Sequence, residues 1–127
     1  MKIETASITD IGLNPKYSVN EDSYLIMKRE RVFAVADGVG GAFAGDVASR
    51  SALEIINKGI HKFSKQHKNN KIIFIQKLIK AGNKLVYQLS QKENKQMAST
   101  IAMMMVEENY AVLGHVGDSR IYVARNG

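Results

Sequence analysis

The chain has 127 residues, of which 45% are hydrophobic, and it carries a formal net charge of +6 and no cysteine. This length suits one domain or part of a larger one, and the hydrophobic content is sufficient for a packed core. The lack of cysteine excludes disulfides and thiolate metal sites. No stretch has the apolar length of a signal-peptide core or a membrane span, so we expect a cytoplasmic protein.

The positive charge is concentrated in one part of the chain. Residues 58–95 contain ten lysines and a single acidic residue, Glu93. A basic patch is typical of nucleic-acid-binding proteins, but the aromatic residues do not alternate with these lysines as a base-stacking platform requires. Because charge runs usually form solvated faces, we interpret this one as the lysine-coated surface of a helical segment.

The first third of the chain has the pattern of short strands. We expect a first strand over residues 2–8, a loop over residues 10–19, and two further strands over residues 23–28 and 32–36. Only the charged stretch 28–31 separates the last two strands, so they are expected to form a hairpin.

Apolar residues then recur at the spacing of one helix face. This periodicity predicts a helix over residues 47–63 and a second over residues 75–89, joined by a polar linker over residues 65–71. Glycine lowers the stability of a helix interior, so we expect Gly59 and Gly82 each to mark a close contact between helices.

The strand pattern returns near Thr100. We expect strands over residues 100–106, 110–116 and 120–124, with turns between them. Residues 103–105 are three consecutive methionines, which we interpret as core residues. His115 lies in an apolar run and is expected to be a buried core histidine.

Asn126 and Gly127 form a strong hairpin signal, because both residue types tolerate a positive φ. A hairpin requires a returning strand, so we expect this sequence to be the N-terminal part of a longer protein. The strand expected over residues 120–124 would then lack its partner. Since unpaired strand edges and uncovered apolar faces promote association, we expect the 127-residue chain to self-associate.

The stretch Val32 to Gly41, VFAVADGVGG, ends a short apolar strand with a carboxylate and glycines. A dinucleotide-binding loop would need a glycine where Phe43 stands. A P-loop would need lysine and serine or threonine where Asp46 and Val47 stand. Neither nucleotide-binding motif fits.

The carboxylates of this region suggest a metal site. Glu21 and Asp22 begin one strand of the expected hairpin and Asp37 ends the other, so the three should lie at one edge of the sheet. Like charges this close are unfavourable unless a cation joins them, and Mg²⁺ and Mn²⁺ prefer oxygen ligands. Gly38 would allow its carbonyl to approach such an ion. The alternative is that Asp37 only opens a turn, as Asp-Gly pairs often do.

Several motifs in register resemble the metal-dependent protein phosphatases of type 2C, in their bacterial form. These motifs are NEDSYL (20–25), VFAVADGVGG (32–41), MASTIA (97–102) and HVGDSRIYVARNG (115–127). The resemblance covers nearly the whole chain. It implies an α+β fold that is part of a two-sheet antiparallel β-sandwich flanked by helices. Residues 1–127 would be the N-terminal part of a single catalytic domain.

The resemblance also implies a chemistry and its residues. Water bound by two Mn²⁺ or Mg²⁺ ions would hydrolyse phosphoserine or phosphothreonine in protein substrates. Asp37 matches the aspartate that bridges the two ions, and Gly38 matches a carbonyl ligand. Glu21 and Asp22 match an acidic pair that binds partly through water, so that Asp22 and Asp37 are the candidate catalytic residues. Asp118 matches the aspartate associated with a third, weaker ion.

This sequence departs from the family pattern at the phosphate-binding position. The family usually has an arginine five residues before the aspartate matched by Asp22, and Tyr17 stands there. The adjacent Lys16 is the candidate for binding the substrate phosphate, although it lacks the bidentate fork of arginine. The family takes further metal-binding aspartates from beyond residue 127, so we expect the 127-residue chain alone to be inactive.

Two alternatives stay open beside a phosphatase with a signalling role. A catalytically inactive, phosphatase-like regulatory or binding module is suggested by Tyr17. A lysine-rich nucleic-acid-binding protein is suggested by the charge run alone. Under the leading interpretation we expect neither nucleic acid nor a membrane as a partner.

Overall fold

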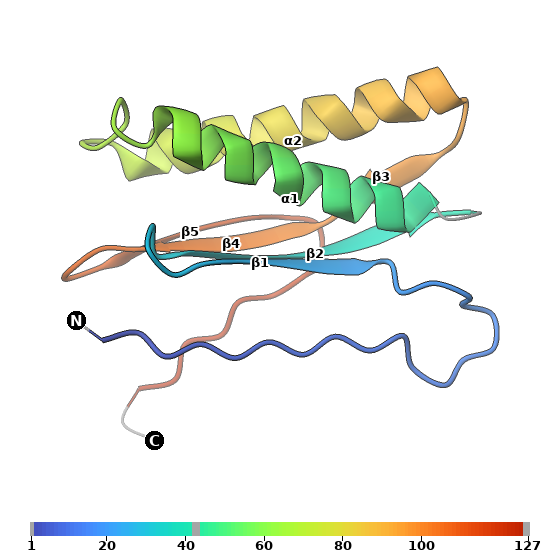
Figure 1. Ribbon diagram of the computed structural model, residues 1–127, viewed down its shortest axis with the longest axis horizontal. Coiled ribbons are helices and arrows are strands. Elements are labelled where there is room, and N and C mark those ends of the chain that lie inside the picture. The colour runs from blue at the N-terminus through green and yellow to red at the C-terminus, as the bar shows by residue number, and fades with distance from the viewer. Residues whose placement is uncertain (1, 42–43, 126–127) are drawn as a thin grey trace.

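The computed structural model describes residues 2–41 and 44–125. Within them the elements are β1 (Asp22–Met27), β2 (Val32–Gly40), α1 (Ala44–Phe63), α2 (Lys71–Glu93), β3 (Met97–Ser99), β4 (Ile101–Val106) and β5 (Ala111–Val116). The strands pair in the order β1-β2-β4-β5, with β3 paired to the far end of β2. Both helices cover the same face of this sheet, and the two terminal segments pass on the other side (Figure 1).

The hairpin predicted near the N-terminus is confirmed, and its second strand is longer than expected. β1 and β2 are antiparallel, with Asp22 opposite Asp37 and Met27 opposite Val32. The sequence pattern predicted that the second strand ends at Ala36. It continues through the glycines because β3 pairs with them, Gly38 lying opposite Ser99.

The core lies between the sheet and the helices. Alternate residues of β2 and β4 face the helices, and those of β2 include Val32 and Ala34, which are at most 5% exposed. Ile56 of α1 and Phe74 of α2 meet this layer and are fully buried. Burial of a side chain of this size stabilises a fold by about 1.5–3 kcal/mol, so the two helices are held mainly by their apolar faces.

The contacts predicted for the two helix glycines are confirmed. A Cβ built on Gly59 would lie 2.5 Å from Cδ2 of Leu78, which belongs to α2. A Cβ on Gly82 would lie 3.3 Å from Cδ1 of Ile101 in β4 and, at van der Waals distance, 3.6 Å from the carbonyl oxygen of Ala52, which belongs to α1. The absent side chain at Gly59 therefore allows a close approach of the two helices, and Gly82 lies in van der Waals contact with α1.

The second helix begins earlier than the apolar spacing predicted. The Asn70 side chain accepts a hydrogen bond from the Ile73 amide at 3.0 Å and so caps the first turn. Ile72 and Ile73 of that turn are exposed, which obscured the periodicity. The helix ends at Glu93, and its C-cap residue, Asn94, has a φ of +48°.

Two predicted strands do not form. Residues 2–8 and 120–124 pair with no strand among the described residues, and a strand exists only where a neighbour accepts its backbone hydrogen bonds. The hairpin signal at residues 126–127 lies outside the described residues.

Two predictions about the core need correction. His115 is exposed, because in β5 it alternates onto the sheet face that the helices do not cover. Of the three methionines, Met103 and Met105 are buried on the helix side, whereas Met104 is only half-buried.

The sheet face opposite the helices carries apolar side chains. We call it the open face. Tyr24 and Val35 are cross-strand partners on it and are each 49% exposed, and Leu113 of β5 is 45% exposed. No helix of the described chain is both long enough and apolar enough to cross a membrane.

Candidate metal and catalytic site

One pocket brings together the five residues proposed for metal binding. Its volume is about 500 Å³, and it lies where β1 begins and β2 passes into its glycines. The lining residues include all five candidates: Glu21, Asp22, Asp37, Gly38 and Asp118. Residues far apart in sequence thus meet in one hollow.

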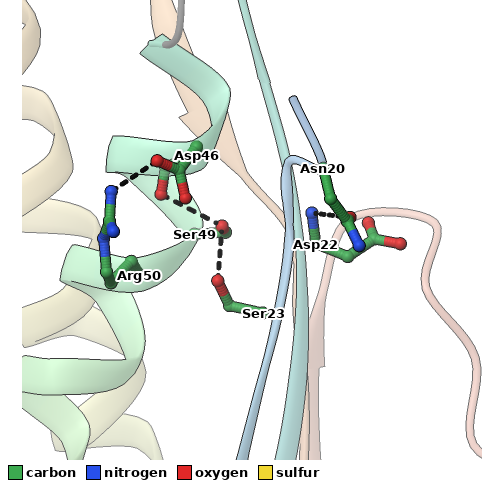
Figure 2. A network of polar contacts seen from close by, with 6 residues as sticks. All are labelled: Asn20, Asp22, Ser23, Asp46, Ser49 and Arg50. Carbon is green, nitrogen blue, oxygen red and sulfur yellow. Dashed lines mark hydrogen bonds and ion pairs between the residues drawn. The ribbon is translucent and has the colours of Figure 1, made fainter. Parts of the chain in front are cut away.

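Asp22 and Asp37 form the centre of this arrangement. They lie directly opposite each other on β1 and β2, so their side chains share the open face. The Asn20 side chain accepts a hydrogen bond from the Asp22 amide at 3.0 Å (Figure 2) and donates one to the Thr9 hydroxyl at 2.8 Å. This turn fixes the start of β1 and therefore the place of the Asp22 carboxyl.

The electrostatics of the pocket are those of crowded carboxylates. Burial raises the pKa of Asp37 above its ordinary value, and the negative charges of Asp22 and Asp118 raise it further. A hydrogen bond between the Asp22 and Asp37 carboxyl groups acts in the same direction. Each cause favours either a proton or another cation beside Asp37.

Glu21 places its carboxylate differently from Asp22. A Cβ built on Gly45, in the first turn of α1, would lie 2.5 Å from Oε1 of Glu21 and 2.8 Å from Oε2. The helix dipole favours a negative charge at this end of α1. Because neighbouring side chains of a strand alternate, Glu21 faces the helices while Asp22 faces the open side. Glu21 therefore borders the pocket from the side of α1, whereas Asp22 and Asp37 border it from the open face.

This division affects how much of a metal site the described residues assemble. Among residues 2–41 and 44–125, no group of three or more Asp, Glu or His side chains is arranged so that it could hold a metal ion. Asp22, Asp37 and Asp118 line one pocket without forming such a group.

Gly38 is required sterically. Its amide donates to the Glu21 carbonyl at 3.0 Å. A Cβ on Gly38 would overlap the carbonyl oxygen of Gly45 and lie 2.9 Å from that of Glu21. The glycine that the sequence associated with a metal ligand thus also allows α1 to begin against β2.

A short polar network holds the first turns of α1 on β1 (Figure 2). Ser49 is fully buried, and its hydroxyl lies 2.9 Å from that of Ser23, the residue after Asp22. The same hydroxyl donates to the Asp46 carbonyl at 3.3 Å, and Arg50 pairs with the Asp46 carboxylate. This network fixes the helix beside the strand that carries Asp22.

The phosphate-binding candidates are separated by the structure. Tyr17 lines the pocket, whereas Lys16 is not among the described residues that do so. The Lys16 amide donates to the Asn14 side chain at 3.1 Å and the Tyr17 amide to the Asn14 carbonyl at 3.1 Å, so a compact turn sets both positions.

Sequence reasoning did not single out the hydroxyl residues around Asp37. The Asp37 amide donates to the Thr100 hydroxyl at 2.9 Å, and the Thr100 hydroxyl lies 2.6 Å from that of Ser119. The signal in the sequence was the pair Ser99–Thr100 directly before the apolar run that begins at Ile101.

Comparison with known proteins decides the family. A family model described as protein phosphatase 2C matches residues 16–127. The chain belongs to the protein phosphatase 2C family. The resemblance of its motifs to this family is thereby confirmed, and so is the expected α+β class with helices against an antiparallel sheet.

Individual members of the protein phosphatase 2C family show how much of the chain is covered. The serine/threonine phosphatase stp of Listeria innocua is 30% identical over 113 residues, which are 84% of this chain and 45% of that protein. The crystal structure of the Mycobacterium tuberculosis serine/threonine phosphatase PstP/Ppp matches with a TM-score of 0.76 at 28% identity, over 87% of this chain and 45% of that one.

A second structure of PstP bears on metals. It is the catalytic domain in complex with two manganese ions, and it matches with a TM-score of 0.74 at 29% identity, over 87% of this chain and 46% of that chain. This protein phosphatase 2C chain thus spans about half the length of the relatives it matches.

Proposed function

We propose that the protein containing this chain is a metal-dependent protein serine/threonine phosphatase, with residues 1–127 as the N-terminal part of a single catalytic domain. The observation that carries this proposal is the cross-strand pair Asp22 and Asp37 in a pocket that Asp118 also lines. The relatives named as serine/threonine phosphatases support it.

The donor chemistry of the pocket fits divalent cations. The charged residues that line it are all carboxylates, which are oxygen donors of the kind that Mg²⁺ and Mn²⁺ prefer. Their mutual repulsion would be relieved by a bound cation. Manganese is supported by the two ions in PstP. Use of Mg²⁺, and a third ion near Asp118, are further parts of the proposal.

The residues of this chain would have distinct tasks. Asp37 and Asp22 would hold the ions, with Glu21 and the Gly38 carbonyl completing the near side. When bound, such ions acidify water and neutralise the charge that develops on phosphoryl oxygens. The substrate class proposed is phosphoserine and phosphothreonine in proteins. Lys16 is the candidate residue of this chain for contact with the substrate phosphate.

The test uses the full-length protein with p-nitrophenyl phosphate and a phosphothreonine peptide, with and without Mn²⁺. We expect Mn²⁺-dependent hydrolysis that Asp37→Asn reduces by at least about a hundredfold, because this change removes the charge that binds the ions. Glu54→Gln, an exposed acid on α1, is the matched control and should retain activity. No Mn²⁺-dependent hydrolysis by the wild-type protein would overturn the proposal.

The second candidate function is an inactive phosphatase-like binding module. It is favoured by one observation, namely that Tyr17 lines the pocket at the position where the family usually has arginine. Mn²⁺ binding and phosphopeptide binding without turnover would support it. A cytoplasmic location, a signalling role, the lack of nucleic-acid and membrane partners, and inactivity of residues 1–127 alone stay predictions.

A further inference from the structure

The pairing of β2 with β3 and β4 is interrupted at two neighbouring positions, Ala36 and Asp37. Gly38 pairs with Ser99 and Val35 pairs with Ala102. Both pairings have the same register, which places Thr100 opposite Asp37, and yet β3 ends at Ser99 and β4 begins at Ile101. The interruption therefore covers the pairs Ala36–Ile101 and Asp37–Thr100, and Thr100 is the residue that lies in neither β3 nor β4.

The hydrogen bonds explain the break. The Thr100 amide donates to the Asp37 carbonyl at 2.8 Å, as in an ordinary ladder. The return bond is different, because the Asp37 amide donates to the Thr100 side-chain hydroxyl at 2.9 Å. The Thr100 carbonyl instead accepts from the Ser99 hydroxyl at 2.8 Å. A side chain thus replaces a backbone group at the residue that carries the central carboxylate.

The same hydroxyl reaches the segment of Asp118. Thr100 Oγ1 lies 2.6 Å from the Ser119 hydroxyl, and a hydroxyl has enough donor and acceptor capacity for both contacts. The methyl group of Thr100 packs against the same loop, at Gly117. Gly117 has a φ of +92°, and a Cβ on it would lie 2.7 Å from Cγ2 of Thr100. One threonine therefore contacts both sides of the loop turn that presents Asp118.

We propose that Thr100 is a positioning residue whose hydroxyl holds the Asp37 backbone and the Asp118 loop together, so that both carboxylates stay at one pocket. We call the contacts among Asp37, Thr100 and Ser119 the hydroxyl bridge. Its purpose follows from electrostatics, since two carboxylates without a cation repel each other and a surface loop would relax toward solvent. The inference rests on the metal site of the proposed function.

The informative variants keep one half of the threonine side chain at a time. Thr100→Val keeps the shape and the contact with Gly117 but removes the hydroxyl. The strand pair is then free to close the ordinary amide-to-carbonyl bond, which would move Asp37. Thr100→Ser keeps the hydroxyl and loses the methyl group. Ser119→Ala removes the other end of the bridge and leaves the ladder unchanged.

Mn²⁺ binding by the full-length protein, measured by isothermal titration, is the readout. We expect Thr100→Val to weaken Mn²⁺ binding about tenfold or more, as loss of residues that orient metal ligands commonly does. Thr100→Ser should stay near wild type. Ser90→Ala is the control. It also removes a hydroxyl, which donates to the Lys95 carbonyl at 2.6 Å at the C-terminal end of α2 and does not contact Asp37, Thr100 or Ser119.

A double-variant cycle tests whether the hydroxyls act together. If the bridge exists, Thr100→Val and Ser119→Ala combined should weaken Mn²⁺ binding less than the sum of their separate free-energy effects. Saturating Mn²⁺ should restore much of the kcat of Thr100→Val. A variant that had only unfolded would not recover its kcat at any Mn²⁺ concentration.

The outcomes separate the two proposals. Equal Mn²⁺ affinity for wild type and Thr100→Val, or fully additive effects in the cycle, would overturn the hydroxyl bridge while leaving the phosphatase proposal in place. Mn²⁺ binding by the wild type without hydrolysis of any phosphoester would overturn the phosphatase proposal alone. A wild-type protein that binds no Mn²⁺ would overturn both.

Discussion

Asp22 and Asp37 lie opposite each other on adjacent antiparallel strands, with both carboxyl groups on the open face of the sheet. Like charges directly opposite across a strand pair are destabilising. The pair of ionised carboxylates therefore destabilises the folded state, and a bound cation would remove this destabilisation.

This relationship predicts how stability depends on pH when no metal is bound. The folded state raises the pKa of Asp37 above 3.8, so the folded protein binds this proton more tightly than the unfolded chain does. The resulting stabilisation is complete below pH 3.8 and is lost as the pH rises through the raised pKa. Above the raised pKa, the ionised Asp37 destabilises the metal-free fold.

Asp37→Asn should consequently raise the Tm of the EDTA-treated protein at neutral pH. The gain in Tm should disappear in acid, where the Asp37 carboxyl of the wild type is protonated and is as uncharged as the amide of the variant. Thermal unfolding across a pH series measures this, with Glu54→Gln as the exposed carboxylate control. A Tm for Asp37→Asn at or below that of the wild type at neutral pH would contradict the assignment of strain to this pair.

Gly38→Ala should be strongly destabilising, because the added methyl would overlap the Gly45 carbonyl at the start of α1. We expect a loss of about 3 kcal/mol in the free energy of unfolding, the upper range for overpacking. Gly41→Ala is the matched control three residues away, since no described atom lies within 4 Å of its added Cβ. Urea unfolding compares the two, and equal midpoints would show that α1 moves aside without cost.

The exchange of Tyr17 tests phosphate recognition in the full-length protein. Tyr17 lines the pocket and Lys16 does not do so among the described residues, so Tyr17→Arg should lower the KM for a phosphopeptide. Lys16→Ala should change the KM little. The reverse ranking, with Lys16→Ala raising the KM and Tyr17→Arg without effect, would assign phosphate contact to Lys16.

The open face predicts self-association of the 127-residue chain. Val35 and Leu113 are apolar, exposed and located on this face. Replacing both by lysine should yield monomers in light scattering coupled to size exclusion, because charge at exposed positions of a sheet face opposes their burial. Ile72→Lys, at an exposed apolar position of α2, is the control and should leave association unchanged. A monomeric wild-type chain at high micromolar concentration would contradict the prediction.

The hairpin, the two helices and the central strands were predictable because their patterns are local. The alternation in β1 and the apolar stripe of α1 are properties of short windows. The proximity of Asp22 and Asp37 followed from the hairpin register alone.

What could not be predicted depends on groups that are distant in sequence. The continuation of β2 past Ala36 requires β3, and the substitution of the Thr100 hydroxyl for a backbone acceptor requires a register between residues 63 positions apart. The position of the Glu21 carboxylate is set by Gly45, which no pattern around Glu21 reveals. Likewise, the strands expected over residues 2–8 and 120–124 depended on partners that local patterns do not specify.

The position of β2 in the sheet has a consequence for the order of folding. β1 is connected to β2 by a tight turn, so this pair is local in sequence. β4 pairs with β2 only after the chain has passed through both helices. Contacts between residues this far apart in sequence require the loss of loop-closure entropy. Such contacts therefore form late during folding. Because Thr100 and Asp118 join Asp37 only through this return, the pocket should be among the last parts of the chain to appear during refolding. Quenched-flow hydrogen exchange would then show the β1–β2 turn protected before the amide of Asp37.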